Sequence, residues 1–151
     1  MSVPVKIFAE DLKHNEGLPS YAKIGDSGMD IRANERVTIP PKETMLIHTG
    51  IHVGIPEGYE IQVRPRSGLS LKTKLRVANS PGTVDQSYTG EVCVIAENTH
   101  GSQDFIVNIG DRIAQLVLQE VPKIEWVPVQ DKTQLGDTAR GSDGFGSTGS
   151  N

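Results

Sequence analysis

The sequence predicts an all-β fold, a sandwich, barrel or jelly roll assembled from short strands. Segments of period-two or continuous β-branched character recur along the chain, separated by Gly and Pro signals about every 8–12 residues. The 16 Gly and 9 Pro residues are typical of a turn-rich β chain. The hydrophobic fraction of 36% is low for a lone domain, so we expect oligomerisation to provide part of the burial.

The predicted strands follow one another from the N-terminus to the polar end of the chain. Their expected ranges are residues 3–9, 29–33, 36–39, 44–55 with a break at Gly50, 59–65, 77–78, 91–98, 104–109, 112–121 and 125–127. Helical pattern is nearly absent, and we expect at most one short helix, with Ser67 as its N-cap. The turn residues of "NSPGTVDQSYTGEV" favour a β-hairpin with limbs at residues 83–85 and from Glu91 onward.

The C-terminal residues predict an arm rather than a packed element. After Trp126 the composition becomes polar, and residues 130–151 lack the apolar residues for a core of their own. We therefore divide the chain into a β core, residues 1–129, and a mobile arm, residues 130–151. Fully extended, such an arm spans roughly 70 Å. Its glycine-rich end can thus reach a distant site, including one on another subunit.

Charge and cysteine content limit the partners and the compartment. A formal charge of −4, with no Lys/Arg-rich run, argues against a nucleic-acid partner held by phosphate neutralisation. No apolar run approaches the length of a membrane span, and the N-terminus lacks the apolar stretch of a signal peptide. The single cysteine, Cys93, fits a reducing compartment and a buried small hydrophobe rather than a nucleophile. We expect a cytoplasmic protein without nucleic-acid or membrane partners.

The arm carries residue types that can hold a nucleotide. In "RGSDGFGSTG", residues 140–149, the glycines leave backbone N–H groups free to surround phosphate oxygens. Ser147 and Thr148 add hydroxyl donors, and Arg140 adds a bidentate charge. Phe145 can stack on a base, a role that a merely flexible tail does not require. A solvated glycine tail is the alternative.

Four further segments show polar groups in suggestive positions. Arg64 and Arg66 precede the predicted helix, whose first amides favour an anion. Gln115 lies among apolar neighbours, where its amide needs partners, as a phosphate contact or a satisfied core residue. Asp30 directly follows a Gly turn, where it can hold a metal-bound water or cap the turn.

The predicted hairpin combines an amide, a carboxylate and an aromatic hydroxyl. Asn79, Asp85 and Tyr88 are close together in sequence, which suits the recognition of a small polar ring. The alternative is an ordinary hairpin with a turn-type Asp and a packed Tyr. His48 and His52 share a strand face if that segment is regular, but Gly50 intervenes and no third ligand follows. We therefore expect surface or interface packing there rather than a zinc site.

These segments, taken in order, resemble the five motifs of the homotrimeric, all-β dUTP diphosphatases, or dUTPases. The matching stretches are "SGMDIRA", "PRSGLSLK", "NSPGTVDQSYTGEV", "GDRIAQLVL" and "RGSDGFGSTG", and the resemblance covers nearly the whole chain. It implies a jelly-roll-like, distorted β-barrel assembled as a homotrimer with active sites at subunit junctions. It also implies Mg²⁺-dependent hydrolysis of dUTP to dUMP and pyrophosphate.

The resemblance assigns roles to the third motif. Asp85 matches the carboxylate that orients and deprotonates the attacking water. Tyr88 matches the residue whose ring packs on the deoxyribose and leaves no room for a 2′-hydroxyl. Asn79 and hairpin backbone groups, among them those of Gly82, Thr83 and Val84, correspond to the reader of the uracil edge, which also excludes a thymine methyl group.

The remaining motifs supply phosphate contacts. Arg66, Ser67 and Gly68 match phosphate ligands of the second motif, and Gln115 matches one of the fourth. Asp30 matches a residue that helps to hold the hydration shell of Mg²⁺ through water, while the ion itself is bound mainly by substrate phosphates. In the family the arm of one subunit closes over the site of another; the matching arm residues are Arg140, Gly144, Phe145, Gly146, Ser147 and Thr148.

Two alternative functions and one departure accompany the resemblance. A dCTP deaminase shares the fold and the trimer, but its chemistry needs groups that protonate and attack cytosine, and the hairpin here has the Asp–x–x–Tyr arrangement of the diphosphatase. A nucleotide-binding signalling protein that retains the pocket is the other alternative. Asp143 stands where the family usually has glycine, and its carboxylate would repel a γ-phosphate unless it turned to solvent.

Overall fold

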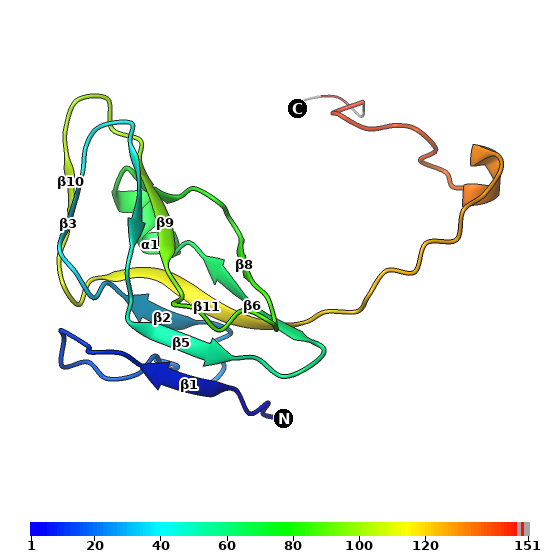
Figure 1. Cartoon of the computed structure of the whole chain (residues 1–151). Helices are drawn as coiled ribbons and strands as arrows, with labels where there is room; N and C mark the ends of the chain where they lie inside the picture. The colour runs from blue at the N-terminus through cyan, green and yellow to red at the C-terminus, as the bar shows by residue number, and fades with distance from the viewer. Residues whose placement is uncertain (148, 150–151) are drawn as a thin grey trace.

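The computed structural model describes residues 1–147 and residue 149 of the chain, and it is built mainly from short antiparallel strands (Figure 1). The strands are β1 (Lys6–Ala9), β2 (Met29–Arg32), β3 (Val37–Ile39), β4 (Thr44–Ile47), β5 (Ile51–Gly54), β6 (Tyr59–Arg64), β7 (Leu75–Val77), β8 (Gly82–Val84), β9 (Val94–Asn98), β10 (Phe105–Val107) and β11 (Arg112–Glu120). One short α-helix, α1 (Ser67–Lys72), and one turn of 3-10 helix, η1 (Lys132–Leu135), complete the secondary structure. The predicted all-β class is confirmed.

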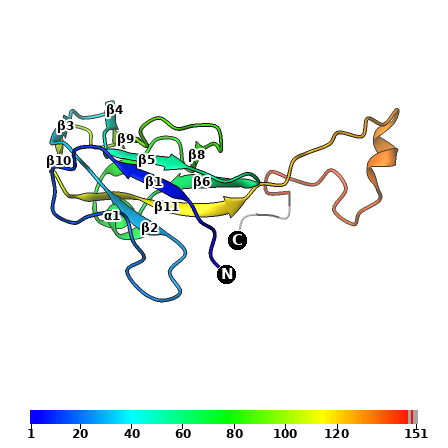
Figure 2. The ribbon, with the colours of Figure 1, turned by 60° about the horizontal axis from the view of Figure 1, so that its bottom comes forward.

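Backbone hydrogen bonds divide the strands among four sheets that share one core. The orders are β2-β11-β6-β8, β4-β9-β7, β1-β5 and β10-β3, and the arrangement is jelly-roll-like without closing into a continuous barrel. The long strand β11 is the central element, pairing with β2 along its first half and with β6 along its second. In Figure 2, β1, β5, β6 and β11 run along the body in similar directions.

The core consists of the alternate, inward-facing residues of these strands. The fully buried side chains include Ile31, Ile39, Ile47, Val94 and Val107, each at most 1% exposed. Burial alternates along the strands, as in β3 and β7, so period-two patterning correctly predicted the elements. Burial of this kind stabilises a fold by about 1.5–3 kcal/mol for each large aliphatic side chain.

The expected break at Gly50 is confirmed and has a steric cause. Gly50 separates β4 from β5 with φ of +70°, and a Cβ there would lie 2.8 Å from the carbonyl oxygen of Glu10. Only glycine fits this left-handed position beside another backbone. The sharp turn also presents the Thr49 and Gly50 amides to one carboxylate oxygen of Glu91.

Three sequence-based expectations about local structure were wrong. Residues 83–85 do not pair with the segment from Glu91 onward: β8 pairs with β6, while β9 pairs with β4 and β7. The N-cap of α1 is Arg66, whose side chain makes no capping bond, and Ser67 is the first helical residue. Residues 125–127 form no strand, because they lie in an exposed extended segment without a backbone partner among the described residues.

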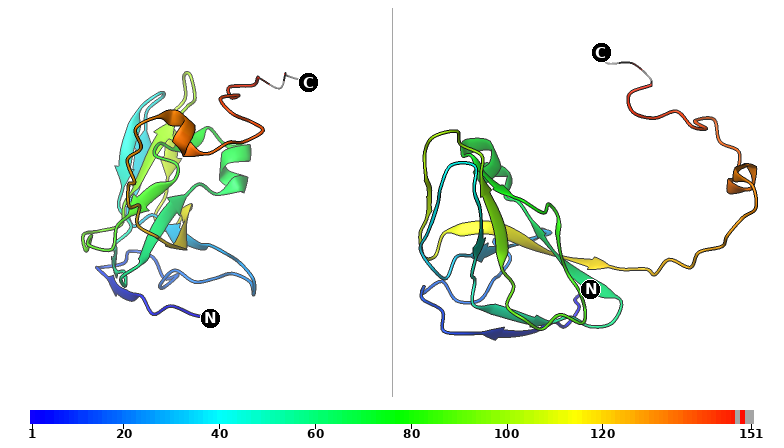
Figure 3. Two further views of the ribbon diagram at one scale, coloured as in Figure 1. Left: turned by 90° about the vertical axis from the view of Figure 1, so that its right-hand side faces the viewer. Right: turned by 45° about the horizontal axis from the view of Figure 1, so that its top comes forward.

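After β11 the chain leaves the body and continues as a long excursion (Figure 3, right). The side chains of Ile124, Trp126 and Val127 are 73–81% exposed. Within this excursion, η1 is held by a capping box in which Asp131 accepts from the Thr133 amide and the Gln134 side chain accepts from the Asp131 amide. This turn was not expected from the sequence. Neither helical segment in residues 1–147 combines the length and apolar character required to cross a bilayer.

Candidate functional site

A cavity of about 300 Å³ lies beside β8 and gathers most of the predicted third-motif residues. Its lining includes Asn79, Gly82, Thr83, Val84, Asp85 and Tyr88. Buried Val84 anchors the end of the strand, and Asp85 follows it with its side chain exposed. The Tyr88 amide then donates to the Asp85 carbonyl at 3.0 Å, which closes a turn. The carboxylate of Asp85 is therefore held at the rim of a cavity on a packed scaffold.

Tyr88 is positioned by a hydrogen bond and by a glycine. Its hydroxyl donates to the carbonyl oxygen of Glu91 at 2.7 Å. A Cβ on Gly90 would lie 2.6 Å from that hydroxyl oxygen, so only glycine lets the phenol fold back to this place. The ring remains 47% exposed, with one face available to a ligand. Sequence reasoning missed the role of Gly90, which depends on the path of the Tyr88 side chain.

Gly82 sits where a side chain would close the cavity floor. A Cβ there would lie 3.2 Å from the Asn79 amide nitrogen and 3.3 Å from Cβ of Val63. The backbone of β8 can therefore approach both the Asn79 side chain and strand β6 closely. The amide, the strand backbone and the Tyr88 ring form a narrow polar slot, which is suited to a planar ring with hydrogen-bonding edges.

A second cluster surrounds Asp30 at the start of the four-stranded sheet. The Asp30 carboxylate accepts from Nε of Arg66 at 2.7 Å and lies 3.6 Å from an Arg112 nitrogen. Register places Gln115 of β11 opposite Asp30 of β2 on one side and Arg64 of β6 on the other. Asp30 thus holds a guanidinium in place, and Arg112, which sequence reasoning missed, shares its charge. The pairing of β2 with β11 brings these groups together from distant parts of the chain.

Ser67 and Gly68 occupy the exposed first positions of α1, directly after Arg66. Space around Gly68 is open, since a Cβ there would meet no atom within 4 Å. Exposed amides beside an oriented guanidinium can bind an anion such as a phosphate. The predicted second-motif residues are therefore accessible to a ligand.

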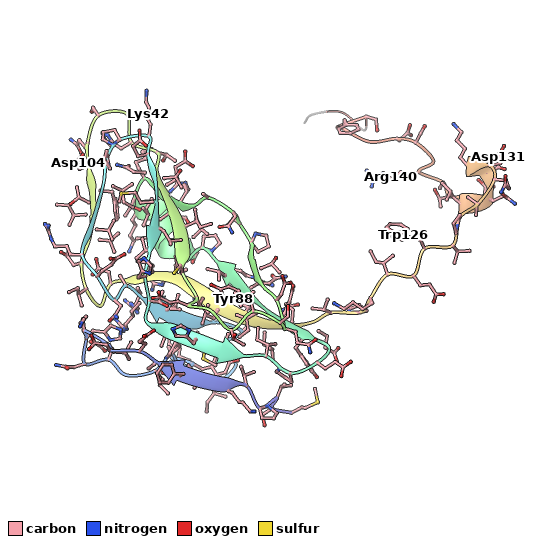
Figure 4. All side chains as sticks on the ribbon, in the orientation of Figure 1. Lys42, Tyr88, Asp104, Trp126, Asp131 and Arg140 are labelled. Carbon is pink, nitrogen blue, oxygen red and sulfur yellow. The ribbon has the colours of Figure 1, made fainter. Side chains whose placement is uncertain are left out.

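The arm residues form local turns and are separated from the cavity. Arg140 donates from Nε to the carbonyl of Asp143 at 2.7 Å, and the Asp143 side chain is exposed. The Ser147 amide donates to the Gly144 carbonyl, Phe145 and Gly146 have φ of +52° and +80°, and Phe145 is fully exposed. Thr148 lies outside the described residues. Figure 4 shows Tyr88 over the body and Arg140 well away from it on the arm.

The structure thus places the predicted residues in three groups within one chain. One lines the Asp85 cavity, one surrounds Asp30, and one lies on the arm. Arg66 and Gln115 are not among the residues that line the Asp85 cavity, and neither are the arm residues. A nucleotide that contacted all three groups would have to draw on more than one copy of the chain or on a different arm position.

A further polar group adjoins the cavity and was not predicted. Glu91 accepts from the Thr49 and Gly50 amides and lies 2.7 Å from Nδ1 of His48. The hydrogen bond from Glu91 raises the pKa of His48. Burial raises the pKa of the neighbouring Cys93 thiol to about 11, in keeping with the expected unreactive cysteine.

Comparison with known proteins identifies the family. The dUTPase family model matches residues 15–149. A deoxyuridine 5'-triphosphate nucleotidohydrolase of Chlamydia felis is 48% identical over 95% of this chain and 97% of its own length. One of Gloeothece citriformis is 49% identical over 96% of this chain and 97% of its own length.

Solved structures agree with the sequence comparison. The dUTPase of Staphylococcus bacteriophage 80alpha, in complex with dUPNHPP, superposes with a TM-score of 0.82 at 27% identity, covering 99% of this chain and 100% of that one. The dUTPase of phage phi11 of S. aureus, which coordinates a structural Mg(II) ion, superposes with a TM-score of 0.76 at 26% identity, covering 86% and 99% of the two chains. The five ordered motifs, the fold and these relatives together establish that the chain belongs to the dUTPase family.

Proposed function

We propose that this protein hydrolyses dUTP to dUMP and pyrophosphate, which limits uracil incorporation into DNA and supplies dUMP for thymidylate synthesis. The observation that carries the proposal is the cavity that joins Asp85, Tyr88 and Asn79 beside β8. It offers a carboxylate, an aromatic ring and an amide around a slot of nucleoside size. The family membership of the chain supplies the substrate class.

Asp85 is the proposed general base. Its side chain is exposed at the cavity rim, directly after buried Val84, so its position is fixed while water can reach it. It would orient a water molecule for attack on the α-phosphorus and take its proton. A base placed in this way contributes about 10²–10⁴-fold to a rate.

The slot between β8 and Tyr88 is the proposed reader of base and sugar. The Asn79 amide and the backbone from Gly82 to Val84 would hydrogen-bond the uracil edge, and the close backbone would exclude a methyl group. The Tyr88 ring, held by the Glu91 carbonyl, would pack on the deoxyribose where a 2′-hydroxyl would clash. This pairing of contacts and exclusions selects a deoxyuridine nucleotide.

Phosphate contacts are proposed for the group around Asp30. Arg66 is held by Asp30, so its guanidinium is oriented before substrate arrives, and Ser67, Gly68 and Gln115 lie near it in the fold. The Asp30 carboxylate is already paired with two arginines, which leaves it suited to a water-mediated contact rather than direct ligation of Mg²⁺. Mg²⁺ bound to the substrate phosphates would neutralise their charge.

The arm is the proposed lid, and we propose a homotrimer whose sites are shared between subunits. Phe145 would stack on uracil, while Arg140, Ser147 and Thr148 would engage the γ-phosphate end, with Gly144 and Gly146 allowing close backbone approach. In support, the three groups of residues are apart within one chain, and the arm is exposed along its length. Closure would exclude water and align the phosphates for in-line attack.

The test is pyrophosphate release from a panel of dNTPs and UTP, with and without Mg²⁺. We expect turnover of dUTP alone, dependent on Mg²⁺. Release from dTTP or UTP at a comparable kcat/KM would overturn the proposed readers. Ammonia release from dCTP would instead identify the related deaminase.

Mixing experiments test whether sites are shared. Subunits carrying Asp85→Asn are mixed with subunits truncated before Arg140 and allowed to exchange. We expect partial recovery of activity, because some sites would combine an intact Asp85 with an intact arm. Absence of recovery, with exchange verified by mass measurement, would mean that each site is built from one chain.

A further inference from the structure

Three side chains that the proposed reaction does not use meet next to the Asp85 cavity. His48 directly follows β4, while Glu91 and Cys93 lie 43 and 45 residues further along the chain, before β9. One ligand atom from each of them lies within 4.8 Å of the other two. Nδ1 of His48 is the common neighbour, 2.7 Å from Oε2 of Glu91 and 3.6 Å from Sγ of Cys93.

These distances are close to those of a tetrahedral zinc site. Zn–S bonds of about 2.3 Å and Zn–N bonds of about 2.0–2.1 Å place sulfur and nitrogen roughly 3.5 Å apart. The Cys93 and His48 atoms already have this separation. The closer His48–Glu91 contact is a hydrogen bond, which a cation would replace by moving the exposed imidazole slightly outward.

The carboxylate of Glu91 is held by the backbone in the orientation that a metal ligand needs. Its Oε1 accepts from the Thr49 amide at 3.0 Å and from the Gly50 amide at 2.7 Å, so Oε2 faces the other two residues. Hydrogen bonds of this outer kind orient ligands and raise metal affinity. Glu35, which accepts from the His48 amide at 3.1 Å, adds a second negative charge nearby.

We propose that His48, Glu91 and Cys93 form a binding site for a divalent cation of the Zn²⁺ class, with water as the fourth ligand. Imidazole and thiolate favour Zn²⁺ over Mg²⁺, which prefers oxygen ligands and retains its waters. The site is therefore distinct from the Mg²⁺ requirement proposed for hydrolysis. Coordination breaks the Cys93 S–H bond, forms a metal–sulfur bond and releases the proton to solvent.

The site is connected to the nucleotide cavity through Glu91. Glu91 and Cys93 line that cavity together with Asp85 and Tyr88, and the Glu91 carbonyl accepts the Tyr88 hydroxyl. An ion on the Glu91 side chain would restrain the segment that supports Tyr88. The sequence did not suggest this site, because His48 and His52 were the visible pair and the remaining ligands lie far along the chain.

Titration with Co²⁺ and Zn²⁺, in the absence of nucleotide, tests the site independently of the proposed hydrolysis. Metal-free, reduced full-length protein should bind one Co²⁺ per chain with a sulfur-to-cobalt charge-transfer absorption, and Zn²⁺ should displace it. Cys93→Ser should abolish that absorption. Loss of an outer-shell partner alone lowers metal affinity about 10–100-fold, so Glu91→Gln should weaken Zn²⁺ binding by at least about tenfold.

His52→Gln is the matched control, because His52 hydrogen-bonds Thr89 and Glu10 rather than the cluster. It should leave Zn²⁺ affinity and the cobalt absorption unchanged. No charge-transfer absorption in the unmodified protein, or equal Zn²⁺ affinity after Cys93→Ser, overturns the proposal. If Cys93→Ser fails to fold, the exposed His48→Gln decides, and unchanged Zn²⁺ affinity in that variant overturns the proposal equally.

Discussion

The Asp85 cavity and the C-terminal arm carry their proposed nucleotide contacts in opposite ways. In the cavity, Asp85 directly follows Val84, which is 7% exposed, and Tyr88 is held by a hydrogen bond to Glu91. In the arm, Phe145 is 112% exposed, and Arg140 is bonded only to the carbonyl of Asp143, three residues away. The cavity is therefore organised before a ligand arrives, whereas the arm must lose conformational freedom on binding.

This difference separates two kinds of mutational effect. A change in the cavity alters groups whose geometry is already fixed, so it should act on the chemical step or on selectivity. A change in the arm should act on closure over bound nucleotide and leave the stability of the β core unchanged. Each variant below either sharpens this separation or breaks it.

The largest effect is expected from Asp85→Asn. Turnover of dUTP should fall about 10²–10⁴-fold, because an amide cannot take the proton of the attacking water. Melting temperature and affinity for a non-hydrolysable dUTP analogue should change little, since the side chain is exposed. Pyrophosphate release, calorimetry and thermal melting measure the three quantities. Asp104→Asn, another exposed aspartate, is the control, and residual turnover above a tenth of wild type would remove Asp85 from the role of base.

Truncation before Arg140 should have the next largest effect. Misalignment of the reacting groups costs about 100-fold in rate, so a protein without the lid should lose at least that much turnover. The melting temperature should stay the same, because the removed residues described here make no hydrogen bond to the β core. Steady-state kinetics and thermal melting test both expectations. An unchanged kcat would show that the arm takes no part in catalysis.

Phe145→Ala isolates the aromatic part of the lid. Stacking of a base on an aromatic ring is worth about 1–3 kcal/mol, so kcat/KM for dUTP should fall about 5–150-fold. Leu135→Ala removes another exposed apolar side chain of the arm and should leave kcat/KM unchanged. A large drop in melting temperature on Phe145→Ala would instead mean that this ring packs into a core in solution.

Local sequence pattern was sufficient for the elements but not for their partners. The alternation of apolar residues predicted β11 and the glycine break before β5, because burial and left-handed φ depend on the residues themselves. The pairing of β8 with β6 could not be predicted, since a nearby turn signal suggested a local hairpin and the true partner lies across the fold. Pairing between distant strands leaves no local signature in a single sequence.

The same distinction applies to the site. Asn79, Asp85 and Tyr88 are close in sequence and meet in one cavity, as their spacing suggested. Arg112 and the cluster of His48, Glu91 and Cys93 acquire their neighbours only through strand pairing and the turn at Gly50. Residues assembled by tertiary contacts are therefore the ones that sequence reasoning missed.

The smallest effect is expected from Gly90→Ala, which tests whether the cavity is as preorganised as its packing indicates. The new Cβ would overlap the Tyr88 hydroxyl, displacing the ring and breaking its hydrogen bond to the Glu91 carbonyl. One such hydrogen bond is worth about 0.5–1.5 kcal/mol, so the preference for dUTP over UTP, measured as the ratio of kcat/KM values, should fall about 2–12-fold.

Gly101→Ala, at a position with open space around it, should leave that ratio unchanged. A Gly90→Ala protein that kept full selectivity would show that the Tyr88 ring adjusts freely. The cavity would then depend on ligand-induced ordering as the arm does, and rigidity would no longer distinguish the two regions. A reduced ratio at an unchanged kcat for dUTP would instead place sugar selection in the fixed geometry of Tyr88, separate from the chemical step at Asp85.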